Sequence, residues 1–380
     1  MKSHRILRII TNSEAEPGGA ANHVFHLSSR LNTVFETMVV CGTGERLIQR
    51  LKRARVPVLS LPTLKRSLSP LLDAACTKEL YRIIVGGKFD IVAAHSTKAG
   101  LVGRLAAAMA HTPLIVFTAH GFSFNEPSGR LRHYVALMEE KLGARLGDHI
   151  IAVSDYDRRS ALQKGVCRED KITTIHNGID AGGLAQTRGF NKEDIGLPPN
   201  SRVIGTIANF YPNKGLGFFV DAFEIVSRNL KDVHAVLIGD GPMLADICSQ
   251  VESKGLKDRV HFYGYREDAT QFVPAFDVFA LSSVKEGFPW ALLEAMALAR
   301  PVAATEVGGI AEMVGEAAAI VPPGDPPSLA SAIIGLLSDR RRATALGMAA
   351  KERVMQNFTL EKMVKKTGQL YLSLLDGRGK

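Results

Sequence analysis

Cysteine is scarce in this sequence, and its few copies stand far apart. The four cysteines are Cys41, Cys76, Cys167 and Cys248, and none belongs to a C-x-x-C motif. A disulfide framework or a cysteine-based zinc site needs closely spaced or repeated cysteines. We therefore expect reduced, mostly packed thiols and a cytoplasmic protein.

Long apolar runs are also missing. Arg8 interrupts the first apolar run, "ILRII", and no stretch of about 18 apolar residues occurs anywhere in the chain. No apolar core of a signal peptide follows the basic N-terminus. These absences predict a soluble chain without a membrane-spanning helix or an export signal.

The chain lacks the mixture of aromatic and basic residues that stacks nucleic-acid bases, so we expect no nucleic-acid partner. Its net charge of +9 is unevenly placed. Residues 1–190 hold 26 Lys and Arg against 16 Asp and Glu, which gives +10, and residues 191–380 hold 21 against 22, which gives −1. The basic half indicates an anionic membrane surface or a phosphorylated acceptor, although an ordinary solvated basic surface remains an alternative.

Short apolar runs alternate with helical patterns along all 380 residues, a length that exceeds the usual size of one hydrophobic core. The strand candidates are residues 5–11, 35–41, 56–61, 89–95, 113–120, 149–154, 171–177, 202–209, 234–240, 259–265, 277–283, 301–307 and 318–323. Helical patterns lie between them, for example at 21–32, 69–87 and 98–110. This alternation predicts an α/β fold of two Rossmann-like domains, each a doubly wound parallel sheet, facing each other across a cleft.

Composition predicts where one domain ends and the next begins. Residues 180–201 are rich in Gly, Pro and polar residues, which is typical of a linker. We expect a first domain at residues 1–185 and a second at 186–358. The segment 359–380 is apolar at helical spacing, and we expect it to form a helix that crosses back to the first domain.

The segment "EGFPWALLEAM" (residues 286–296) sets two glutamates eight positions apart. A proline suits the first turn of a helix, so Pro289 predicts that the helix begins there and that Glu286 precedes it. The free N–H groups and positive dipole of such a helix start attract phosphate. Taken alone, Glu286 and Glu294 are explained equally well as solvated charges at a helix end.

Eight motifs together resemble those of a retaining family-4 glycosyltransferase with the GT-B fold. They are "EPGGAANHV", "TAHGF", "IHNGID", "ANFYPNKG", "LIGDGP", "EGFPWALLEAM", "EVGGIAEMV" and "VPPGDPPSLASAI", in the order in which this family carries them. The resemblance runs along nearly the whole chain. It implies transfer of a sugar from a nucleotide diphosphate donor, with UDP expected by family habit, and it implies no metal and no cofactor.

The resemblance also implies roles for particular residues. It assigns donor binding to Gly18, Gly19, Asn209, Lys214, Gly239, Gly241, Tyr265, Glu286, Gly287, Phe288, Pro289 and Glu294. It assigns catalytic roles to His120, Glu286 and Lys214, with His120 hydrogen-bonding the sugar and Lys214 facing the diphosphate. Family members commonly carry arginine where this chain has Asn209, so a second cation for the diphosphate is not identified. Retention is expected by same-face attack, because the motifs supply no obvious nucleophile.

The acceptor is expected on the first domain, where "HSTKAGLVGRLAA" and "TAHGFSF" resemble enzymes that build capsular polysaccharide, exopolysaccharide or O-antigen. The resemblance implies a polyprenyl-diphosphate-linked saccharide and peripheral association with the inner face of the plasma membrane. Candidate acceptor residues are Gly19, His95, Arg130 and Arg132. The amphipathic segment 129–147, which carries both arginines, is predicted either to touch the membrane or to pack as an ordinary helix.

Other interpretations remain open from the sequence. "DYD" (residues 155–157) matches a metal-binding motif of another glycosyltransferase fold, but its place after a strand favours a helix N-cap. A transferase with a small soluble acceptor would share every donor motif. A nucleotide-sugar 2-epimerase has a similar architecture, but its catalytic carboxylates are not seen in the first half. A nucleotide-sugar sensor without catalysis is the third alternative, given Asn209.

Overall fold

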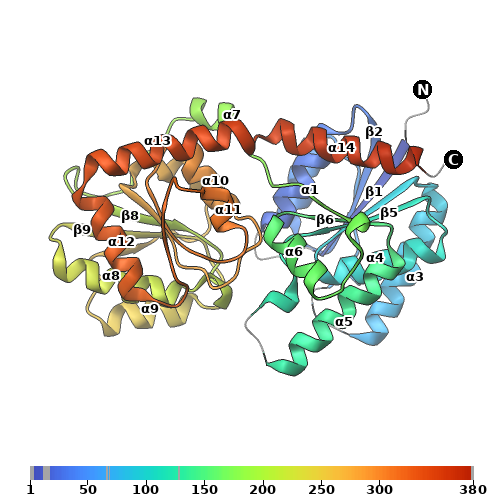
Figure 1. Ribbon diagram of the computed structural model, residues 1–380, viewed down its shortest axis with the longest axis horizontal. Helices are drawn as coiled ribbons and strands as arrows, with labels where there is room; N and C mark the ends of the chain where they lie inside the picture. Colours follow the sequence, from blue (N-terminus) through green and yellow to red (C-terminus); the bar gives the residue numbers. More distant parts are fainter. Residues whose placement is uncertain (1–3, 12–17, 66, 68, 127–128, 378–380) are drawn as a thin grey trace. The chain divides into compact units, whose positions relative to one another are not determined.

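The structure is a computed structural model that describes residues 4–11, 18–65, 67, 69–126 and 129–377. Its chain divides into two compact units. The first unit contains residues 1–176 and 361–380, and the second contains residues 177–360. Figure 1 shows helices on both faces of the sheet in each unit. Glu16 and Pro17 of the first motif, and residues 378–380 of the expected C-terminal helix, lie outside the described residues.

The first unit is built on a seven-stranded sheet of order β3-β2-β1-β4-β5-β6-β7, in which all paired strands are parallel. The strands are β1 (His4–Ile10), β2 (Phe35–Cys41), β3 (Val58–Ser60), β4 (Ile91–His95), β5 (Leu114–Ala119), β6 (His149–Ala152) and β7 (Ile172–Thr174). The helices are α1 (Gly19–Arg30), α2 (Glu45–Arg53), α3 (Pro70–Gly87), α4 (Thr97–Met109), η1 (Ser123–Asn125), α5 (Arg130–Leu146), α6 (Asp155–Gln163), η2 (Glu169–Lys171) and α14 (Leu360–Asp376).

The two faces of this sheet pack against different helices. Leu7 and Ile9 of β1 belong to a buried cluster with residues of α3 and α4. Ile10 belongs to a cluster with α1 and α2 on the other face. The side chain of Arg8 lies on the same face as that of Ile10, because strand side chains alternate. There it is fully buried and its Nη1 donates to the hydroxyl of Tyr371, 3.2 Å away on α14.

The second unit is built on a six-stranded parallel sheet of order β10-β9-β8-β11-β12-β13. Its strands are β8 (Arg202–Ile207), β9 (Val233–Ile238), β10 (Val260–Phe262), β11 (Val278–Leu281), β12 (Val302–Thr305) and β13 (Ala319–Val321). Its helices are α7 (Ala181–Gln186), η3 (Pro212–Lys214), α8 (Leu216–Asn229), α9 (Leu244–Ser253), η4 (Ala269–Ala275), α10 (Trp290–Ala297), α11 (Ile310–Val314), α12 (Pro326–Ser338) and α13 (Arg340–Asn357). Two doubly wound parallel sheets confirm the predicted fold class.

The segment 180–201, whose composition is typical of a linker, is not a free connection in the structure. Its first residues form α7, and its later residues pack on the second unit. Ile195 and Leu197 are buried, and Lys192 donates to the Asp277 carboxylate at 2.9 Å. Although Gly, Pro and polar residues dominate this segment, its few apolar residues pack into the core of the second unit.

The cysteines are free thiols, and two of them, Cys41 and Cys76, are packed in the core, as the sequence predicts. All four are free, and burial raises the pKa of both Cys41 and Cys76 to about 11. Thiols with such a pKa stay protonated and unreactive near neutral pH. Among the described residues, no helix combines the length and the apolar character needed to cross a bilayer.

Candidate functional site

In a doubly wound sheet, ligands bind beyond the carboxyl ends of the strands, where the strand order reverses. In the second unit this point lies between β8 and β11. The loop after β8 ends in Lys214, and the loop after β11 contains Glu286. The Lys214 Nζ lies 2.7 Å from Glu286 Oε1. The structure therefore brings together two site residues that are 72 positions apart in the sequence.

The Glu286 carboxylate is held by its surroundings. Ser283, which is fully buried, donates from Oγ to the same Glu286 Oε1 at 2.6 Å. Gly308 adopts a left-handed φ of 56°, and a side chain there would collide with the Glu286 carbonyl oxygen. Glu286 is only 8% exposed, and its other oxygen, Oε2, receives no hydrogen bond from the described residues. That oxygen is available to a ligand.

Glu294 lies on α10, which begins immediately after this loop. The helix starts at Trp290, so Pro289 is its N-cap residue and stands one position before the predicted first turn. No described residue donates a hydrogen bond to the half-buried Glu294 side chain. Burial raises the pKa of Glu294 from 4.5 to about 8. A carboxyl group that is removed from water and has no donor partner is well suited to accept hydrogen bonds from ligand hydroxyls.

Two glycines of the predicted donor site are explained by close backbone approach. Gly239 and Gly241 both have positive φ, and a side chain on either would collide with the backbone of Ala208 or Phe210. They allow the loop after β9 to lie against the loop after β8, where Phe210 N donates to Asp240 O at 2.7 Å. The side chain of Asn209 lies half-buried in the latter loop.

The remaining predicted donor residues of the second unit lie in the loop after β11 and in the loop after β10. Gly287 O accepts from Gly309 N at 2.9 Å, and the carbonyl of Phe288 accepts from Asn177 Nδ2 at 2.7 Å. Tyr265 follows β10 and is half-buried. The loop that carries Gly287 and Phe288 is thus held by one backbone and one side-chain hydrogen bond within the second unit.

In the first unit the strand order reverses between β1 and β4. Thr11, after β1, and Ser96, after β4, share a hydrogen bond of 2.6 Å between their hydroxyl oxygens. Ser96 has φ 69° and ψ 151°, a strained conformation for a residue other than glycine. Strain of this kind costs about 1–3 kcal/mol and persists where the surrounding contacts hold it. The position of His95, directly before Ser96, is correspondingly well defined.

Three histidines cluster at this edge of the first sheet. His95 ends β4, His120 follows β5, and His23 lies on α1. His95 Nδ1 is 3.2 Å from His120 Nε2, and the His23 and His120 rings meet edge to face at 4.8 Å between centroids. Burial lowers the pKa of His95 and of His120 well below 6.5, and the neighbouring histidines lower it further. Both rings are therefore neutral at pH 7.

Gly18 and Gly19 begin α1 at the same edge. Gly18 is the N-cap residue with an ordinary φ of −70°, and a Cβ there would meet nothing within 4 Å. Packing within the described residues therefore does not require a glycine at this position. The predicted acceptor residues Arg130 and Arg132 lie elsewhere, in the first turn of α5, where both are exposed and Arg132 pairs with Glu126 at 3.3 Å.

The "DYD" segment is a helix cap, as predicted. Ser154 is the N-cap of α6, and its Oγ accepts from Asp157 N at 3.1 Å and donates to Asp157 Oδ2 at 2.9 Å. Asp155 Oδ1 accepts from Thr174 Oγ1 at 2.6 Å. Both carboxylates thus stabilise local structure.

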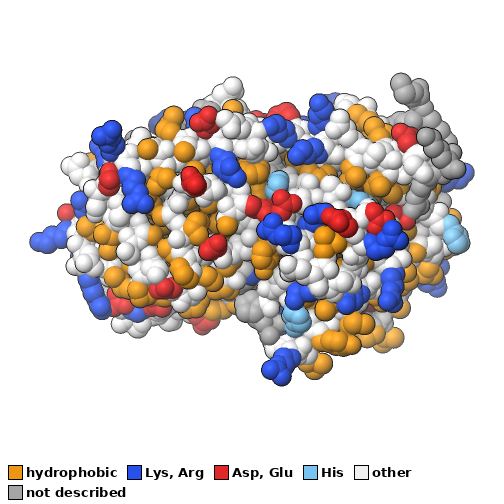
Figure 2. Space-filling model, viewed as in Figure 1, with side chains coloured by type: hydrophobic (Ala, Val, Ile, Leu, Met, Phe, Trp, Pro, Cys, Tyr) orange, Lys and Arg blue, Asp and Glu red, His pale blue; other side chains and the backbone are white. Residues whose placement is uncertain are grey.

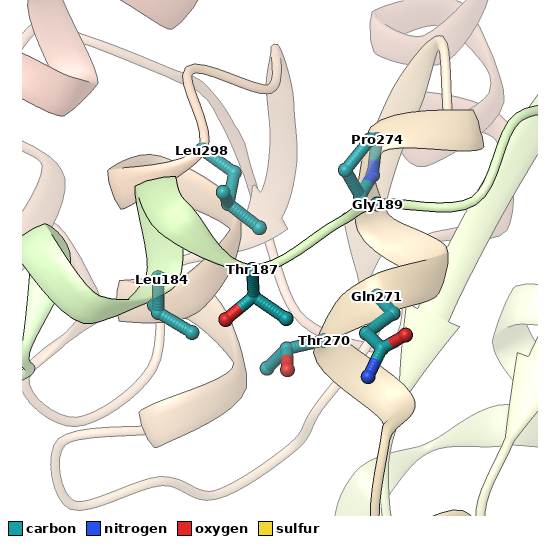
Figure 3. Close-up of a pocket in the computed structure, with 7 residues that line it drawn as sticks. All are labelled: Leu184, Thr187, Gly189, Thr270, Gln271, Pro274 and Leu298. Carbon is teal, nitrogen blue, oxygen red and sulfur yellow. The ribbon is translucent and has the colours of Figure 1, made fainter.

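A small pocket of the second unit lies away from these residues (Figure 3). It is lined by Leu184, Thr187, Gly189, Thr270, Gln271, Pro274 and Leu298. Its residues Thr270 to Pro274 precede β11, whereas Glu286 follows that strand. The pocket therefore lies beside the end of β11 that is remote from the candidate site.

Comparison with known proteins defines the class of protein. Residues 17–182 match the family described as Glycosyltransferase Family 4, and residues 201–339 match the one described as Glycosyl transferases group 1. The structure of Anabaena HepE in complex with UDP-glucose superposes with a TM-score of 0.81 and 22% identity, over 97% of this chain and 99% of that one. A sucrose-phosphate synthase from Thermosynechococcus elongatus superposes with a TM-score of 0.82, at 21% identity over 98% and 100% of the two chains.

Two curated relatives cover nearly the whole chain. The UDP-Gal:alpha-D-GlcNAc-diphosphoundecaprenol alpha-1,3-galactosyltransferase of Escherichia coli is 28% identical over 90% of both chains. The capsular polysaccharide biosynthesis glycosyltransferase CapM of Staphylococcus aureus is 24% identical over 99% of this chain and 98% of its own. The chain belongs to the family-4, group 1 glycosyltransferases with the GT-B fold, which confirms the resemblance of its motifs.

Two residues of the candidate site were missed from the sequence. His23 stands within the first glycine motif but was not singled out, although a histidine one turn after a glycine pair at a strand–helix crossover is a usable signal. Ser283 precedes "EGFPWALLEAM" by three residues, and nothing in its local pattern indicates a hydrogen bond to Glu286.

Proposed function

We propose that this glycosyltransferase transfers a sugar, with retention, from a UDP-sugar to a lipid-linked saccharide in the assembly of a cell-surface polysaccharide. The observation that carries the donor half of this proposal is the Lys214–Glu286–Ser283 cluster, which lies beside the start of α10 at the switch point of the second sheet. The HepE structures contain UDP and UDP-glucose. The Escherichia coli relative supports the acceptor half, because it is a galactosyltransferase for a diphosphoundecaprenol-linked sugar.

In this proposal a cation and backbone N–H groups bind the diphosphate of the donor, and carboxylates bind its hydroxyl groups. We assign the diphosphate to Lys214, to the backbone at Gly287–Pro289 and to the N-terminal end of α10, which attracts anions. Gly18, Gly19, Gly239 and Gly241 would allow backbone to approach the donor closely, with Asn209 and Tyr265 beside it. Glu286 would accept from sugar hydroxyls through its free Oε2, and Glu294 from the two ribose hydroxyls.

The transfer itself would need no covalent enzyme intermediate. Glu286 Oε1 is already committed to Lys214 and Ser283, which suits a binding group better than a nucleophile. We therefore propose same-face attack, in which the departing phosphate accepts the proton of the acceptor hydroxyl. His120 would hydrogen-bond the sugar, and Gly19, Arg130 and Arg132 remain proposed acceptor residues. His95 is fully buried, so it would act on the acceptor through His120 and not by contact. No metal ion is required in this scheme, because Lys214 and the start of α10 stabilise the leaving diphosphate.

The test is nucleotide release from a panel of UDP- and GDP-sugars, with a polyprenyl-diphosphate-linked saccharide as acceptor. We expect acceptor-dependent release from a UDP-sugar. Lys214→Met should lower kcat roughly 100- to 1000-fold, because a cation on the leaving group stabilises charge that develops in the transition state. Lys257→Met is the matched control, since Lys257 is an exposed lysine of the same unit. Donor binding without any release would instead favour a sensor, and equal kcat in Lys214→Met would remove the proposed role of this lysine.

We also propose that the protein associates peripherally with the inner face of the plasma membrane through the first unit. Five large apolar side chains of α5 face solvent at helical spacing: Leu131 (78% exposed), Tyr134 (60%), Val135 (43%), Met138 (45%) and Leu142 (51%). Arg130, Arg132 and Arg145 are exposed on the same helix. Figure 2 shows hydrophobic side chains next to Lys and Arg side chains over this helix. An apolar stripe flanked by cations fits an anionic bilayer surface.

Binding to anionic vesicles is expected to weaken as salt rises, because the screening length falls from about 10 Å at 0.1 M to 3 Å at 1 M. Leu131→Glu combined with Leu142→Glu should abolish binding even at low salt. Met348→Glu is the control, because Met348 is also an exposed apolar side chain, on α13 of the second unit. Unchanged binding across the salt range, or self-association through α5 in place of vesicle binding, would contradict this part of the proposal.

A further inference from the structure

The histidine pair at the edge of the first sheet limits what His120 can present to a ligand. His120 Nε2 lies 3.2 Å from His95 Nδ1, and the two rings are stacked with an interplanar angle of 28°. No described residue bonds to the remaining nitrogen of His120, Nδ1, although protein atoms enclose it. Nδ1 is therefore the nitrogen of His120 that lacks a partner within the described part of the chain, and it can bond a substrate only after the atoms that enclose it shift.

The proton between the two rings determines the chemical character of that nitrogen. A neutral imidazole carries one N–H and one acceptor nitrogen. When His95 Nδ1 holds the shared proton, His120 accepts at Nε2 and has its own proton on Nδ1. When His120 Nε2 holds it, Nδ1 of His120 is an acceptor. One hydrogen bond from His95 thus sets the tautomer of His120.

The surroundings keep the pair neutral and in place. His95 is fully buried, and the strained Ser96 that follows it is tied to Thr11. Burial is the main cause of the low pKa of both rings, and the positive charge of Arg8, on β1, also lowers the pKa of His95. His23, on α1, packs its ring against both. The cluster therefore has the rigidity that a positioning group needs.

We propose that His95 is a positioning residue that holds His120 in one neutral tautomer, with Nδ1 directed at the sugar during transfer. This inference rests on the proposed function for the role of His120, but not for the geometry of the pair. It makes His95 part of the transfer chemistry without contact between His95 and the reacting atoms.

The shape of the side chain at position 95 provides the test. Asparagine places a polar atom where Nδ1 of histidine stands, whereas the terminal amide of glutamine reaches the position of Nε2. We expect His95→Asn to recover part of the kcat that His95→Ala loses, because it restores a hydrogen bond to His120. His95→Ala and His95→Gln should lower kcat about 10- to 100-fold, the usual effect of a misplaced catalytic group. The Kd for UDP should stay unchanged in all three.

The ¹⁵N chemical shifts of His120 provide a readout that does not depend on activity. The parent and His95→Asn should show a single neutral tautomer, and His95→Ala should show exchange between two. If the parent transfers no sugar, the proposed function fails while these shifts still decide the inference. Equal impairment of the Asn and Ala variants, or a His120 spectrum that is the same in His95→Ala as in the parent, would overturn it.

Discussion

Replacing Glu294 by glutamine is expected to stabilise the free protein and to weaken UDP binding. The pKa of Glu294 is raised from 4.5 to about 8 by burial. Between these values the folded protein holds a proton that the unfolded chain releases, so this group makes folding less favourable as pH rises from 4.5 to 8. Allowing for the water that reaches part of the side chain, removing the charge should add roughly 1–3 kcal/mol to the free energy of unfolding at pH 8.

The effect on stability should disappear in acid, because below pH 4.5 the carboxyl group is protonated in both states. Thermal melts at pH 4.5 and pH 8 test this, and a Tm increase of several degrees is expected only at pH 8. Glu252→Gln, at an exposed glutamate of α9, is the control and should not change Tm at either pH. A lower Tm for Glu294→Gln at pH 8 would contradict the assignment of an unfavourable buried charge.

The same substitution should raise the Kd for UDP roughly 30- to 1000-fold. Hydrogen bonds to a charged acceptor contribute about 1.5–3 kcal/mol each, and those to a neutral acceptor about 0.5–1.5 kcal/mol. Glutamine keeps one neutral acceptor for one of the two proposed ribose contacts, so the loss is about 2–4 kcal/mol. Because only the ionised carboxylate accepts from both hydroxyls, the affinity of the parent should rise between pH 7 and pH 8.5. Isothermal titration measures both effects. UDP binding as tight as in the parent would show that Glu294 does not contact the ribose.

Replacing Glu140 by alanine is expected to destabilise the first unit by about 3–5 kcal/mol, because it leaves a buried charge without its partner. Arg104 on α4 and Glu140 on α5 are each 1% exposed, with Nη2 and Oε2 3.2 Å apart. The guanidinium also donates from Nε to Gly100 O at 2.6 Å and lies 4.2 Å from the ring centre of Phe117. This pair fixes the buried side of α5, whose other side carries the exposed apolar stripe.

Denaturant unfolding of single and double variants measures this effect. Glu169→Ala removes an exposed ion pair with Arg158 and should cost less than about 1 kcal/mol. The double substitution Arg104→Met with Glu140→Leu should recover most of the loss, because it removes both charges together. If Glu140→Ala lowers the free energy of unfolding no more than Glu169→Ala does, the prediction is wrong and solvent reaches the Arg104–Glu140 pair.

The sheets could be predicted from the sequence because their signal is local. Each strand of both sheets falls within or overlaps an apolar run such as residues 35–41 or 202–209, and turn residues bound these runs. The parallel direction of the strands could be predicted because a helical pattern lies between successive strand candidates. The donor-site loops were predictable for a related reason, because motifs at the ends of β8 and β11 meet wherever the strands are neighbours.

Contacts between distant side chains could not be predicted in the same way. Arg104 and Glu140 stand 36 positions apart, and each is an ordinary polar residue of its helix until the two helices pack. His95 and His120 were candidates singly, but their hydrogen bond depends on the stagger of β4 against β5. The segment 180–201 was misjudged because Gly and Pro content obscured Ile195 and Leu197.

Hydrogen–deuterium exchange with and without UDP tests most directly whether the switch point of the second sheet is the donor site. With UDP bound, we expect slower exchange at residues 209–216, at residues 284–294 and at the loop 239–241, with no change at residues 254–262. Glu294→Gln should lose this protection at the same UDP concentration. Protection confined to other parts of the second unit, or no protection by any nucleoside diphosphate in a folded protein, would show that the donor binds elsewhere or not at all.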